Sequence, residues 1–308
     1  MSDFTSAKAS HRHGVISVLV ALPFVSLTGL FGKFLTLSPL LIVQGRTVFA
    51  FGALLLAMLF LRKKIFFSEH REWLWLVLSG SILGVHWIAF FQAIQVSTVA
   101  IGLLSFASYP LFTTLLEPLF FREPLRGRNV FAALIVICGL ALMATSSSDD
   151  SNTIISGSVF HGILWGLMAG FGFAVLTLLN RGHVRKHSAL LITCWQNGFA
   201  ALVILPWSLS ESWILSGKEL GLLFLLGVVC TVGGHTLLIN GLRHVRAQVA
   251  SLLIAGLEPV FAILFALFLL GEVPSLQTLL GGVLIISTTV FIIYGTEQKE
   301  ILEQAVSK

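Results

Sequence analysis

Long apolar runs separated by short polar segments dominate the chain. Runs of about 17–25 residues are long enough to cross a bilayer as helices. Ten such runs cover residues 15–35, 39–61, 73–94, 97–121, 129–145, 158–179, 189–209, 220–241, 247–270 and 276–294. Only "QVS" separates the third run from the fourth and only "HVR" the eighth from the ninth, and a merged helix in either place would be too long for a membrane. The pattern predicts an all-α integral membrane protein with ten transmembrane helices.

The composition excludes a soluble domain. The 308 residues are 56% hydrophobic and 11% charged, whereas globular domains carry about 25% charged residues. Most of the protein surface must therefore face the lipid bilayer, which is its predicted environment. The three cysteines lie singly in apolar runs and imply no disulfide framework. The first run lacks a small-residue cleavage site, which favours an uncleaved membrane span over a signal peptide.

Positive charges alternate between the segments that join the predicted spans. Sixteen of the nineteen Lys and Arg residues lie in the two tails and in every second loop, and positive residues are retained on the cytoplasmic side. This predicts a multi-pass plasma (inner) membrane protein with cytoplasmic tails at 1–14 and 295–308. The polar stretch 146–157 contains no Lys or Arg and is predicted to link two halves, 15–145 and 158–294, on the outer side.

The second half repeats the first. Aligning "LGVHWIAFFQAIQVSTVAIGLLSFASYPLF" (83–112) with "VGGHTLLINGLRHVRAQVASLLIAGLEPVF" (232–261) needs no gap. The same register pairs His86 with His235, Pro110 with Pro259 and, farther on, Glu123 with Glu272. Five spans per half is an odd number, so the second half enters the membrane upside down. Two inverted five-helix repeats are an architecture that secondary transporters use for alternating access, with the substrate site near mid-membrane.

Two segments resemble the EamA family of the drug/metabolite transporter superfamily. They are "YPLFTTLLEPLFFREPL" (109–125) and "EPVFAILFALFLLGEVPS" (258–275), each with a proline in the fourth helix of its unit and an acidic signature at the helix end. The resemblance implies a secondary active transporter, and amino acids or related compounds moved outward are the favoured substrates. Drug carriers and other metabolite carriers, of nucleotide or sugar type, share the same fold, and no motif here selects among them.

Other classes of function fit the sequence less well. An intramembrane enzyme needs a His and acidic cluster at one depth, but the intramembrane His and Glu residues are spread across the bilayer. A pore more naturally needs an open polar path or a symmetric oligomer. The chain has no Walker-type phosphate loop, which argues against coupling to ATP. We expect a small-molecule substrate, no cofactor, no metal and no nucleic acid, and either a monomer or a homodimer.

Polar residues within the apolar runs are the candidate site, because such groups normally face the protein interior or a water-filled cavity. Glu258 lies about 16 Å from the cytoplasmic end of its span. Arg46 and His86 lie about 10 Å below the outer surface, so Glu258 and Arg46 are within reach of each other. Glu258 is predicted to be protonated in some states and paired with Arg46 or a substrate ammonium in others. Alternatively, it bonds a carbonyl freed by Pro259.

Further cavity candidates follow from helical spacing and from the repeat. Trp87 and Phe90 form an aromatic stripe with His86, and His235 is the repeat mate of His86; a purely structural role as interhelical hydrogen-bond partners fits both histidines as well. The remaining candidates are Tyr109, Ser108, Trp195 and Gln196. Tyr109 aligns with Glu258 in the repeat. Separately, glycines at 162, 166 and 170 predict close helix packing.

Overall fold

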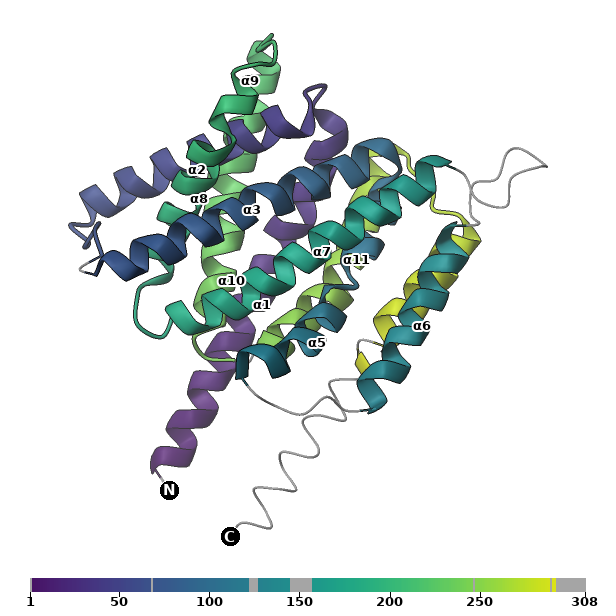
Figure 1. Ribbon diagram of the computed structural model, residues 1–308, viewed down its shortest axis with the longest axis horizontal. Helices are drawn as coiled ribbons and strands as arrows, with labels where there is room; N and C mark the ends of the chain where they lie inside the picture. The colour runs from purple at the N-terminus through teal and green to yellow at the C-terminus, as the bar shows by residue number, and fades with distance from the viewer. Residues whose placement is uncertain are drawn as a thin grey trace.

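The computed structural model describes residues 2–67, 69–121, 127–144, 157–245, 247–288 and 290–291. Helices make up almost all of these residues, and no strand occurs among them (Figure 1). In chain order the helices are α1 (Ser2–Phe34), α2 (Pro39–Phe60), α3 (His70–Val96), α4 (Val99–Phe106), α5 (Tyr109–Phe121), α6 (Gly127–Ala144), α7 (Gly157–His183), α8 (Ala189–Ser208), α9 (Gly217–Phe224), η1 (Leu225–His235), α10 (Thr236–Gly241), α11 (Ala247–Leu270) and a last helix, Leu276–Thr288.

Eight helical segments in the described part of the chain are long and apolar enough to cross a membrane. The all-α membrane fold is therefore confirmed. Helices α6 and Leu276–Thr288 occupy the two other predicted spans, so the count of ten remains a prediction. Nearly all of the predicted linker at 146–157 and the whole tail at 295–308 lie outside the described residues, as does Glu123.

Short polar residues begin several helices at the positions where the apolar runs start. Ser38 accepts a hydrogen bond from the Leu41 N–H, with Pro39 in the first turn of α2. Ser188 and Thr98 cap α8 and α4 in the same way. These side chains satisfy N–H groups that have no partner within the helix. Short polar residues just before the first helical residue, or at the start of an apolar run, thus fix where these helices begin.

The fourth predicted span is broken, which corrects the single helix expected over 97–121. Helix α4 ends at Phe106, and α5 begins at Tyr109. Pro110 then lies in the first turn of α5, where its missing N–H leaves no hydrogen bond unmade. Pro259, its repeat mate, instead lies inside the continuous helix α11. The two aligned prolines therefore have different structural effects.

The eighth predicted span contains a π-helical segment. Helix α9 continues into η1 and then α10 without leaving the helical path. Within η1 the Thr231 hydroxyl donates a 2.8 Å hydrogen bond to the Leu226 carbonyl. A Cβ on Gly227 would lie 2.7 Å from the Phe49 Cβ and 2.8 Å from the Arg46 carbonyl oxygen. This glycine thus allows η1 to lie directly against α2.

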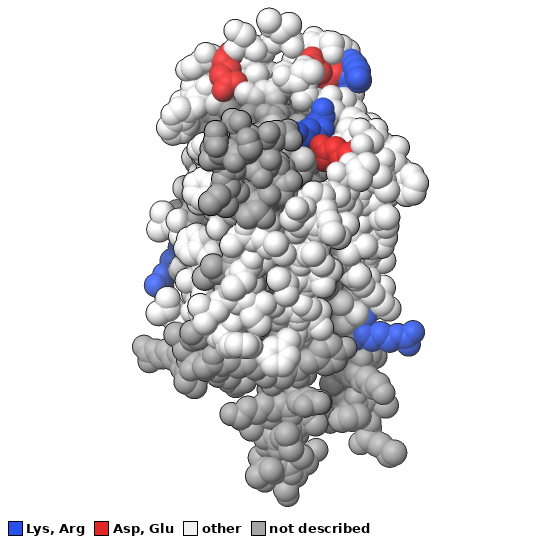
Figure 2. All heavy atoms as spheres, turned by 90° about the vertical axis from the view of Figure 1, so that its right-hand side faces the viewer, with Lys and Arg blue, Asp and Glu red and all other residues white. Residues whose placement is uncertain are grey.

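Helices from the two halves interleave (Figure 1). Helix α3 packs against α7 and α8, α1 against α11, and α4 against α7. The prediction of close packing at the three glycines of α7 is confirmed. A Cβ on Gly162 would lie 2.6 Å from the Ser97 Cβ, at the end of α3. In contact with α4, a Cβ on Gly166 would lie 2.5 Å from the Ser105 Cβ, and a Cβ on Gly170 would lie 3.0 Å from the Phe106 carbonyl oxygen. On the face in Figure 2, the acidic side chains of the described residues lie at the upper end, and the described residues of the broad band below them include none.

Candidate functional site

A buried cavity lies where helices of both halves meet. Its walls come from α1, α2, α3, α4, α7, η1, α10 and α11. The lining residues are Val25, Thr28, Arg46, His86, Trp87, Phe90, Phe106, Phe173, Cys230, His235, Leu238 and Glu258. Six of the ten residues singled out from the sequence therefore meet at one place, namely Arg46, His86, Trp87, Phe90, His235 and Glu258.

Arg46 is the largest buried side chain of the site, with 1% of its surface exposed. Its Nε and Nη2 donate to the Thr231 hydroxyl at 3.2 and 2.7 Å. The guanidinium carbon lies 3.5 Å from the centroid of the Trp87 ring, a favourable position for a cation over an aromatic face. Nη1 is buried and has no hydrogen-bond partner. The guanidinium is thus held on one edge and free on another.

Glu258 is 2% exposed, and its carboxyl makes none of the hydrogen bonds or ion pairs found among the described residues. The expected pairing with Arg46 is not formed within 4.0 Å in this conformation. The alternative bond to the carbonyl freed by Pro259, that of Ala255, is not formed either. Glu258 therefore faces the cavity with its hydrogen-bonding capacity unused.

The two repeat-mated histidines have different partners. His86 Nδ1 donates to the Ala169 carbonyl at 2.8 Å, which assigns the hydrogen to Nδ1 in the neutral ring. This bond holds α3 to α7, where Gly172 leaves room for the His86 Cβ. His235 Nδ1 is buried without a partner, as is Trp87 Nε1. His86 thus has a structural bond, whereas His235 and Trp87 add unpartnered polar atoms to the cavity lining.

Aromatic rings form one wall of the cavity. The Phe106 ring centroid lies 5.4 Å from that of Phe90 and 5.3 Å from that of Phe173. Tyr109 packs behind this wall, 4.8 Å from Phe173, and is absent from the cavity lining. Ser108 also lies off the cavity, and its hydroxyl donates to the Ser105 carbonyl at 2.7 Å. Both predicted residues sit at the break between α4 and α5.

The structure places Trp195 and Gln196 away from the cavity. Trp195 Nε1 donates to the Ile65 carbonyl at 2.7 Å, and its ring lies 4.7 Å from that of Trp73. Gln196 Nε2 donates to Asn180 Oδ1 at 2.6 Å, which joins α8 to α7. Neither residue lines this cavity, and their predicted contact with substrate remains a prediction.

Sequence reasoning missed two phenylalanines of the lining, Phe106 and Phe173, and the residue that holds Arg46, Thr231. Thr231 anchors Arg46 although it does not itself line the cavity. The signal for Thr231 was its spacing of four residues from His235, which places both on one helical face. The phenylalanines gave no signal, because aromatic residues fill most apolar helices of this chain. In the described part of the chain, no three His, Cys, Asp or Glu side chains are placed to share a metal ion.

The free space in the cavity is small. It amounts to about 20 Å³ for the centres of water-sized molecules, which is close to the volume that one water needs. A metabolite cannot enter this space unless helices move apart. The structure therefore shows the cavity in a closed conformation.

Comparisons with known proteins agree with this architecture. The sequence profile of the EamA-like transporter family matches residues 12–145 and again residues 160–294. The uncharacterized transporter YwfM of Bacillus subtilis is 27% identical over 228 residues, which are 70% of this chain and 75% of that protein. The S-adenosylmethionine uptake transporter of Rickettsia conorii is 28% identical over 226 residues, 72% of each chain.

A solved crystal structure shares the fold, with a TM-score of 0.63 and 17% identity over 91% of this chain and 94% of its own. The family and the relatives are transporters and not enzymes. The resemblance seen in the sequence is thus confirmed, and this multi-pass membrane protein belongs to the EamA-like transporter family.

Proposed function

We propose that the protein is a secondary transporter that exports amino acids or related zwitterions across the plasma membrane. The halves 15–145 and 158–294 act as inverted repeats, and the cavity between them opens alternately to each side. One observation carries the proposal: Arg46 from the first half and Glu258 from the second line the same closed cavity. Arg46 Nη1 is buried without a partner, and the Glu258 carboxyl makes no hydrogen bond or ion pair with the residues that the structure describes.

The charges of the cavity suit a zwitterion. A substrate carboxylate is expected to accept from Arg46 Nη1, and a substrate ammonium is expected to donate to Glu258. Buried polar groups without partners are costly, and hydrogen bonds between charged groups are stronger than those between neutral groups. A zwitterion would satisfy both residues at once and would link the two halves while it is bound.

The aromatic wall suits the rest of the substrate. Phe90, Phe106 and Phe173 offer an apolar surface to an uncharged side chain. Trp87 is already covered by the Arg46 guanidinium, so movement of Arg46 toward a substrate would expose its ring. An aromatic face also attracts organic cations. We therefore include amino acids that carry a cationic or aromatic group among the candidate substrates.

S-adenosylmethionine is the second candidate substrate. The Rickettsia conorii relative is named for its uptake. The compound combines an amino-acid zwitterion with a cationic sulfur and an aromatic base, and each part has a complement in the lining. The name of that relative specifies uptake, so the outward direction that we propose needs its own test. A nucleotide- or sugar-phosphate substrate is less well suited, since Glu258, when ionised, repels anions.

Transport by purified protein in liposomes tests the proposal. Vesicles preloaded with one unlabelled amino acid or with S-adenosylmethionine are diluted into the labelled compound, and counterflow is followed. We expect saturable counterflow for at least one zwitterion, a reduced rate and an altered pH profile for Glu258→Gln, and no change for the exposed control Glu69→Gln. An unsaturable flux would contradict the carrier proposal. Identical rates and pH profiles for wild type and Glu258→Gln would exclude Glu258 from the site.

A further inference from the structure

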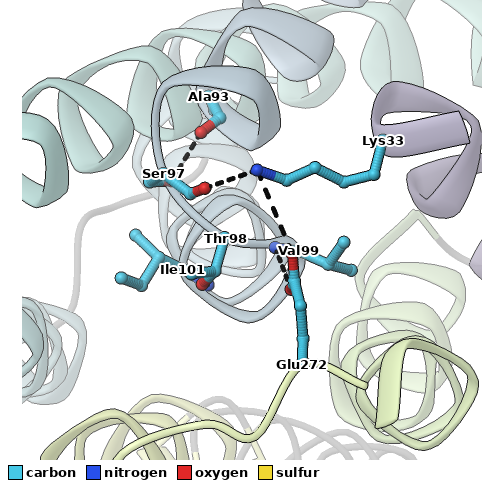
Figure 3. Close-up of polar contacts among 7 residues, drawn as sticks. All are labelled: Lys33, Ala93, Ser97, Thr98, Val99, Ile101 and Glu272. Atoms are coloured by element: carbon cyan, nitrogen blue, oxygen red, sulfur yellow. Dashed lines mark hydrogen bonds and ion pairs between the residues drawn. The ribbon is translucent and has the colours of Figure 1, made fainter. Parts of the chain in front are cut away.

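A polar cluster joins three helix ends on the side of the molecule opposite the predicted cytoplasmic face. It consists of Lys33 at the end of α1, Ser97 and Val99 where α3 meets α4, and Glu272 just after α11 (Figure 3). Three of these residues belong to the first half, and Glu272 belongs to the second. We call these four residues the outer cluster.

Glu272 makes the central contacts of the outer cluster. Its Oε2 accepts a 2.9 Å hydrogen bond from the Val99 N–H, the first amide of α4. Its Oε1 lies 3.9 Å from Lys33 Nζ, which donates a 2.7 Å hydrogen bond to the Ser97 carbonyl. Figure 3 shows that the Lys33 side chain, from α1, and the Glu272 side chain, from the segment after α11, both point toward the start of α4. A carboxylate at a helix N-terminus gains from the helix dipole as well as from the bond.

The chain after α11 is shaped to place this carboxylate. Gly271 has φ +69°, a conformation that residues with a Cβ rarely adopt. The Glu272 N–H then donates back to the Ala266 carbonyl at 3.3 Å. The turn ends α11 and directs Glu272 toward α4. The position of the carboxylate thus depends on a local backbone feature.

The outer cluster fastens two helices that also line the buried cavity. Helix α4 carries Val99 at its start and Phe106 at its end, and Phe106 is in the cavity wall. Helix α11 carries Glu258 in the cavity and leads into Glu272. A gap between these helices would connect the cavity with the outer side. A pocket whose lining includes Thr98, Ile101, Ile263 and Glu272 lies beside the cluster.

We propose that Glu272 and Lys33 are an outer gate, which closes the cavity toward the outer side and must release for substrate to pass. This rests on the proposed alternating access. The hydrogen bond from the Val99 N–H to Glu272 contributes more to holding the gate closed than the ion pair between Glu272 and Lys33 does. Release frees the ends of α4 and α11 to separate, which hydrates the cavity from outside. The gate acts on the access path and does not contact the substrate in the cavity.

Labelling of a native cysteine tests the gate independently of the substrate. Cys230 lines the cavity, so a protein with Cys138→Ser and Cys194→Ser keeps one thiol as a reporter. A charged, membrane-impermeant methanethiosulfonate is added to sealed vesicles on the side opposite the chain termini. We expect labelling of Cys230 to become about tenfold faster with Glu272→Ala, which corresponds to about 1.4 kcal/mol.

Graded variants separate the contributions of the two residues. Glu272→Gln keeps an acceptor for the Val99 N–H and is expected to have a smaller effect than Glu272→Ala. Lys33→Met leaves that bond in place and is expected to accelerate labelling about threefold, in line with the small contribution of partly exposed ion pairs. Lys218→Met removes an outer positive charge away from the cluster and is the matched control, with no expected change.

The outcomes distinguish the gate from the transport proposal. Unchanged Cys230 labelling in Glu272→Ala and Lys33→Met, in protein that elutes as the wild type does on size exclusion, overturns the gate even if wild type transports amino acids. Faster labelling in protein that moves no zwitterion refutes the proposed function and leaves the gate standing. If Glu272→Ala does not elute as folded protein, Lys33→Met and Glu272→Gln decide the question.

Discussion

Replacing Gly166 with alanine is expected to push α7 away from α4. The new Cβ would lie 2.5 Å from the Ser105 Cβ, 3.2 Å from the Gly102 carbonyl oxygen and 3.3 Å from the Phe106 N. Ordinary van der Waals contact begins at 3.4 Å, so the helices must separate by about 0.9 Å at this point. The obstructing atoms are backbone and Cβ atoms, which cannot rotate out of the way.

The expected free-energy change follows from two opposing effects. Overpacking a tight interface costs about 1–3 kcal/mol, whereas replacing glycine with alanine in a helix gains about 0.5–1 kcal/mol. The two ranges leave a net loss of roughly 0–2.5 kcal/mol for Gly166→Ala, centred on about 1 kcal/mol. The displaced helix α4 carries Phe106, which lines the cavity. The rate of transport should therefore fall as well.

Thermal unfolding of the purified protein in detergent measures this change, with Gly52→Ala in α2 as the matched control. A Cβ on Gly52 would meet nothing within 4 Å, so the control keeps only the helix-propensity gain. We expect the unfolding midpoint to fall for Gly166→Ala and to stay level or rise for Gly52→Ala. A midpoint for Gly166→Ala equal to that of the control would refute the close packing of α7 on α4.

Two other substitutions test the surroundings of the site. Thr231→Val removes the acceptor of both Arg46 hydrogen bonds and should lower the free energy of unfolding by about 1–3 kcal/mol. In a double-mutant cycle, Thr231→Val should cost less unfolding free energy in the Arg46→Met background than in wild type. Strictly additive effects of the two substitutions would contradict this coupling. Trp195→Phe removes the hydrogen bond to the Ile65 carbonyl and should lower the midpoint of thermal unfolding. The KM for transport should not change, because Trp195 does not line the cavity. A raised KM with an unchanged unfolding midpoint would show that Trp195 contributes to the substrate site.

The sequence predicted the helices well because lipid solvation requires long apolar segments with satisfied backbones. It predicted less well where a helix changes form without a change in hydropathy. The break at Ala107–Ser108 and the π-helical segment 225–235 both lie inside runs that are long and apolar enough to be read as single continuous helices. Pro110 was a visible sign of the break, but the aligned Pro259 leaves α11 continuous. A proline marks a site where a helix is weakened, and tertiary packing decides whether it breaks.

The candidate site was only partly predictable for a related reason. Hydropathy and rise per residue fix the depth of a side chain in the membrane. They suggested that Arg46 and Glu258 lie within reach of each other, and both residues line the same cavity. Hydropathy and rise do not fix the direction in which a helix face points. Trp195 and Gln196 have suitable depth but face α3 and α7 and the neighbouring loop. Thr231 was missed because the π-helical segment, which orients it toward Arg46, has no hydropathy signature.

The proposed transport depends on a zwitterion that bridges Arg46 and Glu258, and blocked substrate analogues test this bridge. The amino acid with the fastest counterflow, its amide and its N-acetyl derivative are compared as inhibitors of wild type, Arg46→Met and Glu258→Gln. We predict that each blocked analogue inhibits wild type about 10–100-fold more weakly than the amino acid, as expected for loss of a hydrogen bond between charged groups. Arg46→Met should lose discrimination only against the amide, and Glu258→Gln only against the N-acetyl derivative. Equal inhibition of wild type by all three compounds would show that no zwitterion bridges Arg46 and Glu258.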